Sequence, residues 1–162
     1  MITSRFALLR RALTLLAVVG VLLFPVSSVF AAATSFTVTF HDVTESFPDT
    51  NPCSGAAGIV TLTYNGVVHV TLLRNGTSHF TITQTGDLVF VPANSAEPTF
   101  TGHFTFWDGE NENRSSDTDT EIFVVHAVGS DGSTVTIHEV EHVSVSASGV
   151  TISFDKPKLT CG

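Results

Sequence analysis

The fold is decided by an alternating stretch in the first half of the chain, VTLTYNGVVHVTL at residues 60–72. Apolar side chains stand at every second position on either side of Asn65-Gly66, and threonine or histidine stands between most of them. Successive side chains of a strand point to opposite faces, so this period of two predicts strands with one buried and one solvated face. We expect Asn65-Gly66 to be either a turn or a bulge within one long strand.

The same alternation continues through the rest of the chain. From Thr34 onward there are 21 Thr and 21 Val or Ile, against five Leu, and β-branched residues favour sheets over helices. Asn75-Gly76 is the strongest hairpin signal. We predict an all-β, single-domain antiparallel barrel of about eight strands over residues 34–162, with a β-sandwich as the alternative. Residues 44–57 and 108–121 are expected to be irregular.

Residues 1–33 are typical of a signal peptide. Arg5, Arg10 and Arg11 precede an apolar segment at residues 12–24, and small residues at 31–33 supply a cleavage site. We therefore predict a secreted, extracellular protein with no stable membrane span after cleavage. An uncleaved N-terminal anchor is the alternative.

The net charge of −8 averages two different segments of the chain. Residues 1–33 carry three of the seven basic residues and no acidic one, which leaves residues 34–162 with four basic residues against 15 acidic ones, a net charge of −11. Such an acidic domain is not expected to bind nucleic acid by neutralising phosphates.

The two cysteines, Cys53 and Cys161, predict one disulfide. In an oxidising compartment a pair of cysteines with no other partner most simply forms one bond. It would close a loop of over a hundred residues and stabilise the fold by about 4–5 kcal/mol in the chain-entropy model.

Residues 138–142 spell His-Glu-Val-Glu-His, the H-E-x-x-H sequence of zinc proteases. The flanking residues are those of a strand, in which residues four apart lie about 13 Å from each other, too far to share one metal. Glu139 and Glu141 fall on an otherwise apolar face. We expect a bulge near His138 to move them off it, the alternative being that they reach solvent past the end of the sheet.

Two further groups of side chains could bind metal. Four histidines lie on the threonine-rich faces of different segments and would form a zinc or copper site only if the strand order brought them together; otherwise they face solvent. They are His41, His69, His79 and His103. In the expected acidic loop, Asp108, Glu110 and Glu112 are hard oxygen ligands at alternate positions and are our candidate calcium site; a solvated acidic loop is the alternative. We expect no other cofactor.

Seven aromatic side chains are expected to face inward, where they fill a core or line the site of one small apolar ligand. They are Phe36, Phe40, Tyr64, Phe80, Phe100, Phe104 and Phe106.

Several short motifs together resemble a group of small secreted bacterial β-proteins of uncharacterised function. They include Asn51-Pro52-Cys53, Asn75-Gly76 with His79 close behind, His142 before Ala147-Ser148-Gly149, and Cys161. The resemblance implies a bacterial exported β-protein, and it carries over no catalytic residue.

The sequence therefore favours a non-enzymatic extracellular binding or structural module with an unidentified extracellular partner or small ligand. The first alternative is a carrier of a small apolar ligand in a calycin-like barrel. The second is a metal-dependent hydrolase that uses His138, Glu139 and His142. We assign no catalytic residue.

Overall fold

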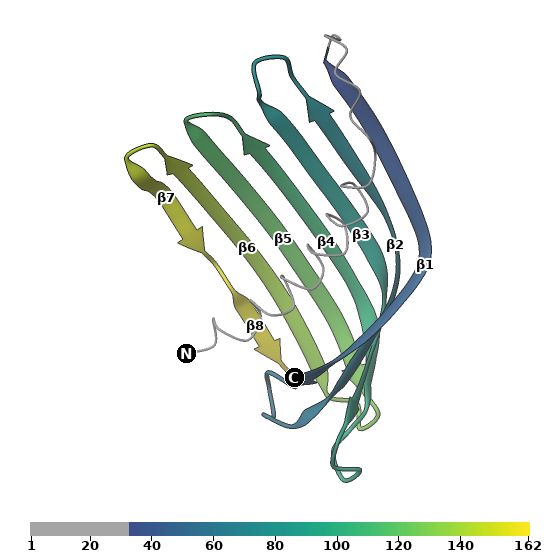
Figure 1. Ribbon diagram of the computed structural model, residues 1–162. Helices are drawn as coiled ribbons and strands as arrows, with labels where there is room; N and C mark the ends of the chain where they lie inside the picture. The colour runs from purple at the N-terminus through teal and green to yellow at the C-terminus, as the bar shows by residue number, and fades with distance from the viewer. Residues whose placement is uncertain (1–32) are drawn as a thin grey trace. The chain divides into compact units, whose positions relative to one another are not determined.

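The computed structural model describes residues 33–162, and every strand in this part of the chain belongs to one antiparallel sheet (Figure 1). The predicted signal peptide, residues 1–33, lies outside the described residues except for Ala33. The strands are β1 (Thr34–Thr50), β2 (Ala57–Leu72), β3 (Ser78–Pro92), β4 (Phe100–Glu112), β5 (Ser116–Gly129), β6 (Thr134–Ser146), β7 (Gly149–Asp155) and β8 (Lys158–Cys161).

The strands follow one another across the sheet in sequence order. Each strand from β1 to β7 pairs with the next, and β8 returns to pair with β6 beside β7. Because β7 pairs with Glu141–Ser146 and β8 pairs with Val135–His138, the two together form one edge that is interrupted at Lys156-Pro157. Proline has no N–H to donate to a neighbouring strand, which fits a break at this position.

The sheet curves but does not close (Figure 1). No pairing joins β1 to β7 or β8 among residues 33–162. The prediction of an all-β, antiparallel fold with about eight strands is confirmed. Because the sheet is open, it fits both an open barrel and the sandwich alternative.

The core lies on the concave face of the sheet. Side chains at alternate positions of β2 to β6 are buried there, while their neighbours in sequence point outward to the convex face. The buried apolar set is Val60, Leu62, Tyr64, Val68, Val70, Ile82, Phe90, Phe100, Phe104, Phe106, Val125, Ala127, Val135 and Ile137.

Aromatic rings and glycines together produce the curvature. The Tyr64 ring lies 5.9 Å from Phe40 and 5.9 Å from Phe104 between centroids, edge to face in both pairs. Gly86 pairs with Tyr64 across β2 and β3, and a Cβ on it would lie 2.6 Å from the Tyr64 Cβ atom. Gly66 leaves room in the same way for the Phe40 ring. Glycine at such positions permits a bend that larger residues would block.

The predicted disulfide between Cys53 and Cys161 is confirmed. It joins the connection after β1 to the end of β8, with 5.9 Å between the Cα atoms and a sequence separation of 108. These two segments belong to opposite edges of the sheet, so the bond holds the edges together at one end, where Figure 1 marks the C-terminus.

Of three local expectations, one is confirmed in part and two are wrong. The alternative of one long strand through Asn65-Gly66 is confirmed for β2, but the irregularity lies opposite it, between Phe40 and Val43 of β1. There Asp42 adopts a φ of 52°, and its N–H donates to the Asn65 Oδ1 atom over 3.0 Å.

The second expectation was that residues 44–57 and 108–121 are irregular, but they are mostly strand. β1 extends to Thr50, and only residues 113–115 separate β4 from β5. The third is the bulge expected near His138. β6 pairs with β5 over residues 134–146 without a register shift, because no residue is inserted on either strand.

Candidate functional site

Nine carboxylates share the concave face of β4 to β7, and we call this group the acidic patch. It contains nine of the 15 acidic residues of the chain. Its members are Asp108, Glu110 and Glu112 of β4, Asp117, Asp119 and Glu121 of β5, Glu139 and Glu141 of β6, and Asp155 of β7. The patch occupies the half of these strands remote from the disulfide, where the β4–β5 and β6–β7 turns lie (Figure 1).

The strand register places these carboxylates directly opposite one another. Asp108 pairs with Glu121, Glu121 pairs with Glu141, and Glu141 pairs with Asp155. A row of four acidic side chains therefore crosses four neighbouring strands, which lie about 4.8 Å apart in any sheet. Like charges directly opposite each other destabilise a sheet, so the patch costs folding energy unless a cation offsets it.

Asp108 is the most buried member at the β4–β5 side of the patch. Asp108 is only 6% exposed, and no other group of the described chain donates a hydrogen bond to its Oδ1 atom. Burial raises the pKa of Asp108 to about 8, with further contributions from the charge of Asp119, a hydrogen bond with that side chain, and the charges of Glu121 and Glu110. This carboxyl is therefore mostly protonated at neutral pH.

Other carboxylates beside Asp108 are also withdrawn from solvent. Burial raises the pKa of Glu110, and the charges of Asp117, Asp119 and Glu112 add to the effect. The Oδ1 atoms of Asp117 and Asp119 are buried, and no other group of the described chain donates a hydrogen bond to them. The β4–β5 part of the patch is thus a group of desolvated acidic side chains.

A neutral oxygen lies beside them. Gln84 of β3 is 3% exposed, and its Oε1 atom has no hydrogen-bond partner. It pairs with Phe106, two residues before Asp108 on the same face of β4. The buried, unpartnered oxygens therefore extend from β5 to β3.

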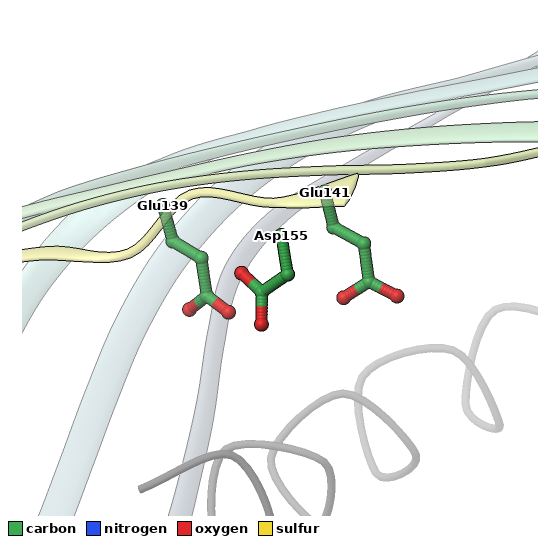
Figure 2. Close-up of side chains that lie close together, drawn as sticks. All are labelled: Glu139, Glu141 and Asp155. Carbon is green, nitrogen blue, oxygen red and sulfur yellow. The ribbon is translucent and has the colours of Figure 1, made fainter. Parts of the chain in front are cut away.

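The other side of the patch gathers three carboxylates from β6 and β7. Glu139, Glu141 and Asp155 each offer an oxygen atom, and these atoms lie within 4.8 Å of one another. Figure 2 shows the three side chains extending from the same side of the sheet. Among residues 33–162 this is the only such group of three or more metal-binding side chains.

The candidate calcium residues Asp108, Glu110 and Glu112 lie on the concave face of one strand, and not in a loop. Side chains at alternate positions of a strand are about 7 Å apart, so these three span about 13 Å along β4. The donors nearest to Asp108 belong to β5, across the sheet. Any ion bound here takes its ligands from neighbouring strands.

The H-E-x-x-H sequence is divided between the two faces of β6. Glu139 is buried on the concave face, whereas His138 and His142 occupy convex positions. His142 stacks on Phe154 with 5.4 Å between ring centroids, and its Nδ1 atom lies 2.7 Å from the Thr120 hydroxyl. The two histidines and the glutamate do not form a zinc site.

The four histidines of the second predicted group all lie outside the concave face and have separate neighbours. The His69 and His79 rings hydrogen-bond with Thr37 and Asn111 respectively, and His41 with Asn65. His103 lies 2.6 Å from an Asp87 carboxylate oxygen, with both side chains exposed. Within the described chain they contribute to no cluster of three metal ligands.

The patch was not predicted as one surface. Gln84 was not among the predicted site residues, and the carboxylates of residues 108–121 were expected in an acidic loop. The signal that could have revealed them is the period-two spacing of Asp117, Asp119 and Glu121, which continues into the apolar alternation of β5.

Comparison with protein-family models, with curated proteins and with solved structures finds no match to this chain. Residues 33–162 include no helix of the length and hydropathy that a membrane span requires. The disulfide is consistent with an extracellular or otherwise oxidising location.

Proposed function

We propose that this protein is an exported, non-enzymatic binding module that holds a cationic ligand on its concave face. The observation that carries the proposal is the acidic patch: carboxylates face one another across β4 to β7, Asp108 and Glu139 among them are buried, and no other group of the described chain donates a hydrogen bond to the Asp108 Oδ1 atom. Buried charge is costly unless it is paired, so a sheet that retains such a surface gains stability when a cation binds.

The distribution of basic residues supports a ligand from outside the described chain. Residues 33–162 contain Arg74, Arg114, Lys156 and Lys158. The two arginines lie in turns, Lys156 lies between β7 and β8 over the Phe154 ring, and Lys158 pairs with His138 on the convex side. None of these four occupies a concave position in a strand.

The division of the H-E-x-x-H residues between two faces favours a binding role over a metal-dependent hydrolase. Export, an extracellular location and a bacterial source rest on residues 1–33 and on the sequence resemblance, and they remain predictions of this proposal.

Thermal unfolding of the purified protein with spermine, a compact polyamine, tests the proposal. We expect spermine to raise the melting temperature and the double variant Glu110→Gln/Asp119→Asn to lose most of that shift. Glu97→Gln is the matched control, because Glu97 lies in the β3–β4 connection, away from the patch. An equal spermine shift in the double variant and the wild type, or none in either, would refute a cation-binding concave face.

A further inference from the structure

The acidic patch offers only oxygen ligands. Its nine members are carboxylates, and the additional buried oxygen beside them is the side-chain amide oxygen of Gln84. Histidine and cysteine, which zinc and copper favour, are absent from this part of the concave face in the described chain, since the histidines of β2 to β6 take convex positions and both cysteines form the disulfide. Carboxylate and amide oxygens are ligands of hard cations such as Ca²⁺ and Mg²⁺.

The unpartnered oxygens identify where in the patch an ion would lie. Asp108 and Asp119 are diagonal neighbours on β4 and β5, since Asp108 pairs with Glu121 and Asp119 pairs with Glu110. No other group of the described chain donates a hydrogen bond to their buried Oδ1 atoms, and the two side chains hydrogen-bond with each other. A divalent cation in place of the proton that they share would stabilise both carboxylates.

Gln84 provides a second, independent observation. As a neutral amide it has no electrostatic reason to avoid hydrogen bonds, yet its Oε1 atom is buried and unpartnered on β3, diagonal to Asp108. Diagonal neighbours on a sheet lie about 7–8 Å apart at the backbone, within reach of a long side chain. If this side chain turns toward Asp108, its amide oxygen would add a ligand from a third strand.

We propose that the concave face binds Ca²⁺ between β4 and β5, with Asp108 and Asp119 as central ligands. No three carboxylates of this part of the patch have oxygens within 4.8 Å of one another, so Glu110, Glu121 and the Gln84 amide would join the site by turning toward the ion. The inference rests on the proposed function and specifies the ligand class. Ca²⁺ suits the site better than Mg²⁺, because it accepts six to eight oxygens in irregular geometry, whereas Mg²⁺ requires a near-octahedral set.

Calorimetric titration of the protein with Ca²⁺, after chelator treatment and buffer exchange, tests the inference. We expect saturable binding in the micromolar to millimolar range, weaker binding of Mg²⁺, and at least about a tenfold loss of Ca²⁺ affinity in Asp119→Asn. Asp108→Asn should lose affinity in the same way while still folding, because it removes like-charge repulsion. Glu97→Gln again serves as the control.

The spermine experiment separates the two proposals. If Ca²⁺ does not bind up to millimolar concentrations but spermine still stabilises the wild type and not the double variant, the calcium inference is wrong and the proposed function stands. If neither cation acts through the patch, both are wrong. Ca²⁺ binding that is unchanged in Asp108→Asn and Asp119→Asn would also overturn the inference, because the ion would then lie elsewhere.

Discussion

At the scale of single residues, Asp108 makes stability depend on pH in an unusual direction. Carboxylates of most proteins have a lowered pKa in the folded state, whereas burial and neighbouring carboxylates raise the pKa of Asp108 from 3.8 to about 8. The charged groups facing it are Glu110 on its own strand and Asp119 and Glu121 on β5. The native protein therefore retains a proton that the unfolded chain releases.

We expect the free energy of unfolding of the metal-free protein to fall as the pH rises between about 4 and about 8, because the folded state binds more protons over that window. The expected fall is on the order of 1–3 kcal/mol, since interacting carboxylates share the proton. Denaturant unfolding at several pH values measures it. Asp108→Asn should flatten the dependence, and an unchanged slope in this variant would contradict the assignment.

Gly86 makes a second prediction at this scale. Gly86→Ala would place a methyl group against Tyr64 and the backbone of Thr63, and we expect a loss of about 1–3 kcal/mol of stability because the two strands cannot separate without disturbing the core. Thr105→Ala, on the exposed convex face of β4, should change stability by less than about 0.5 kcal/mol. Similar unfolding free energies for both variants would show that the sheet relaxes around Gly86.

At the scale of elements, the two faces of β6 make different contacts. Its concave side carries Glu139 and Glu141 to the patch, and its convex side attaches β7 through the stack of His142 on Phe154. β7 pairs with no other strand in the described part of the chain, so these convex contacts contribute to keeping Asp155 beside Glu141.

We expect His142→Ala to lower the free energy of unfolding by about 1 kcal/mol, because the ring loses its stack on Phe154 and its bond with Thr120. His138→Ala, at an exposed convex position of the same strand, is the matched control and should have little effect. A zinc-dependent activity abolished by both variants would instead support the hydrolase hypothesis.

The alternation of apolar and polar residues predicts which side chains share a face, because the period of a strand is fixed at two. Of the seven aromatic side chains expected to face inward, four are buried, namely Tyr64, Phe100, Phe104 and Phe106, whereas Phe36, Phe40 and Phe80 are half-buried. The alternation could not predict which carboxylates meet. That depends on register, and register depends on the length of each turn. The β4–β5 turn is only residues 113–115. Acidic residues have low strand propensity, so Asp108 to Glu121 were assigned to a loop, and Glu139 and Glu141 were explained by a bulge that does not exist.

At the scale of the whole described sheet, the arrangement of its two edges depends on the disulfide at one end and on curvature elsewhere. The pairings that join β1 to β6 with one another do not involve Cys161. Cys161 belongs to β8, which contributes only four residues paired with β6. The bond therefore restrains the separation of the two edges more than it builds the sheet.

Reduction of the Cys53–Cys161 bond should lower the free energy of unfolding by about 3–5 kcal/mol while the sheet signal in circular dichroism persists. Hydrogen exchange should show the amides of β8 losing protection first, because few contacts hold them. The double variant Cys53→Ala/Cys161→Ala, which cannot respond to a reductant, is the control. Equal stability before and after reduction would contradict this role.

The position of the two cysteines also imposes an order in time. Cys53 lies in the first connection of the sheet, and its partner follows 108 residues later, in the last strand. Each hairpin from β1 to β6 can form from neighbouring sequence as the chain emerges, but the cross-link must wait until β8 has been synthesised. Until then the Cys53 thiol has no partner within the described domain. We therefore expect correct maturation to require an oxidant that is still available after β8 has been synthesised.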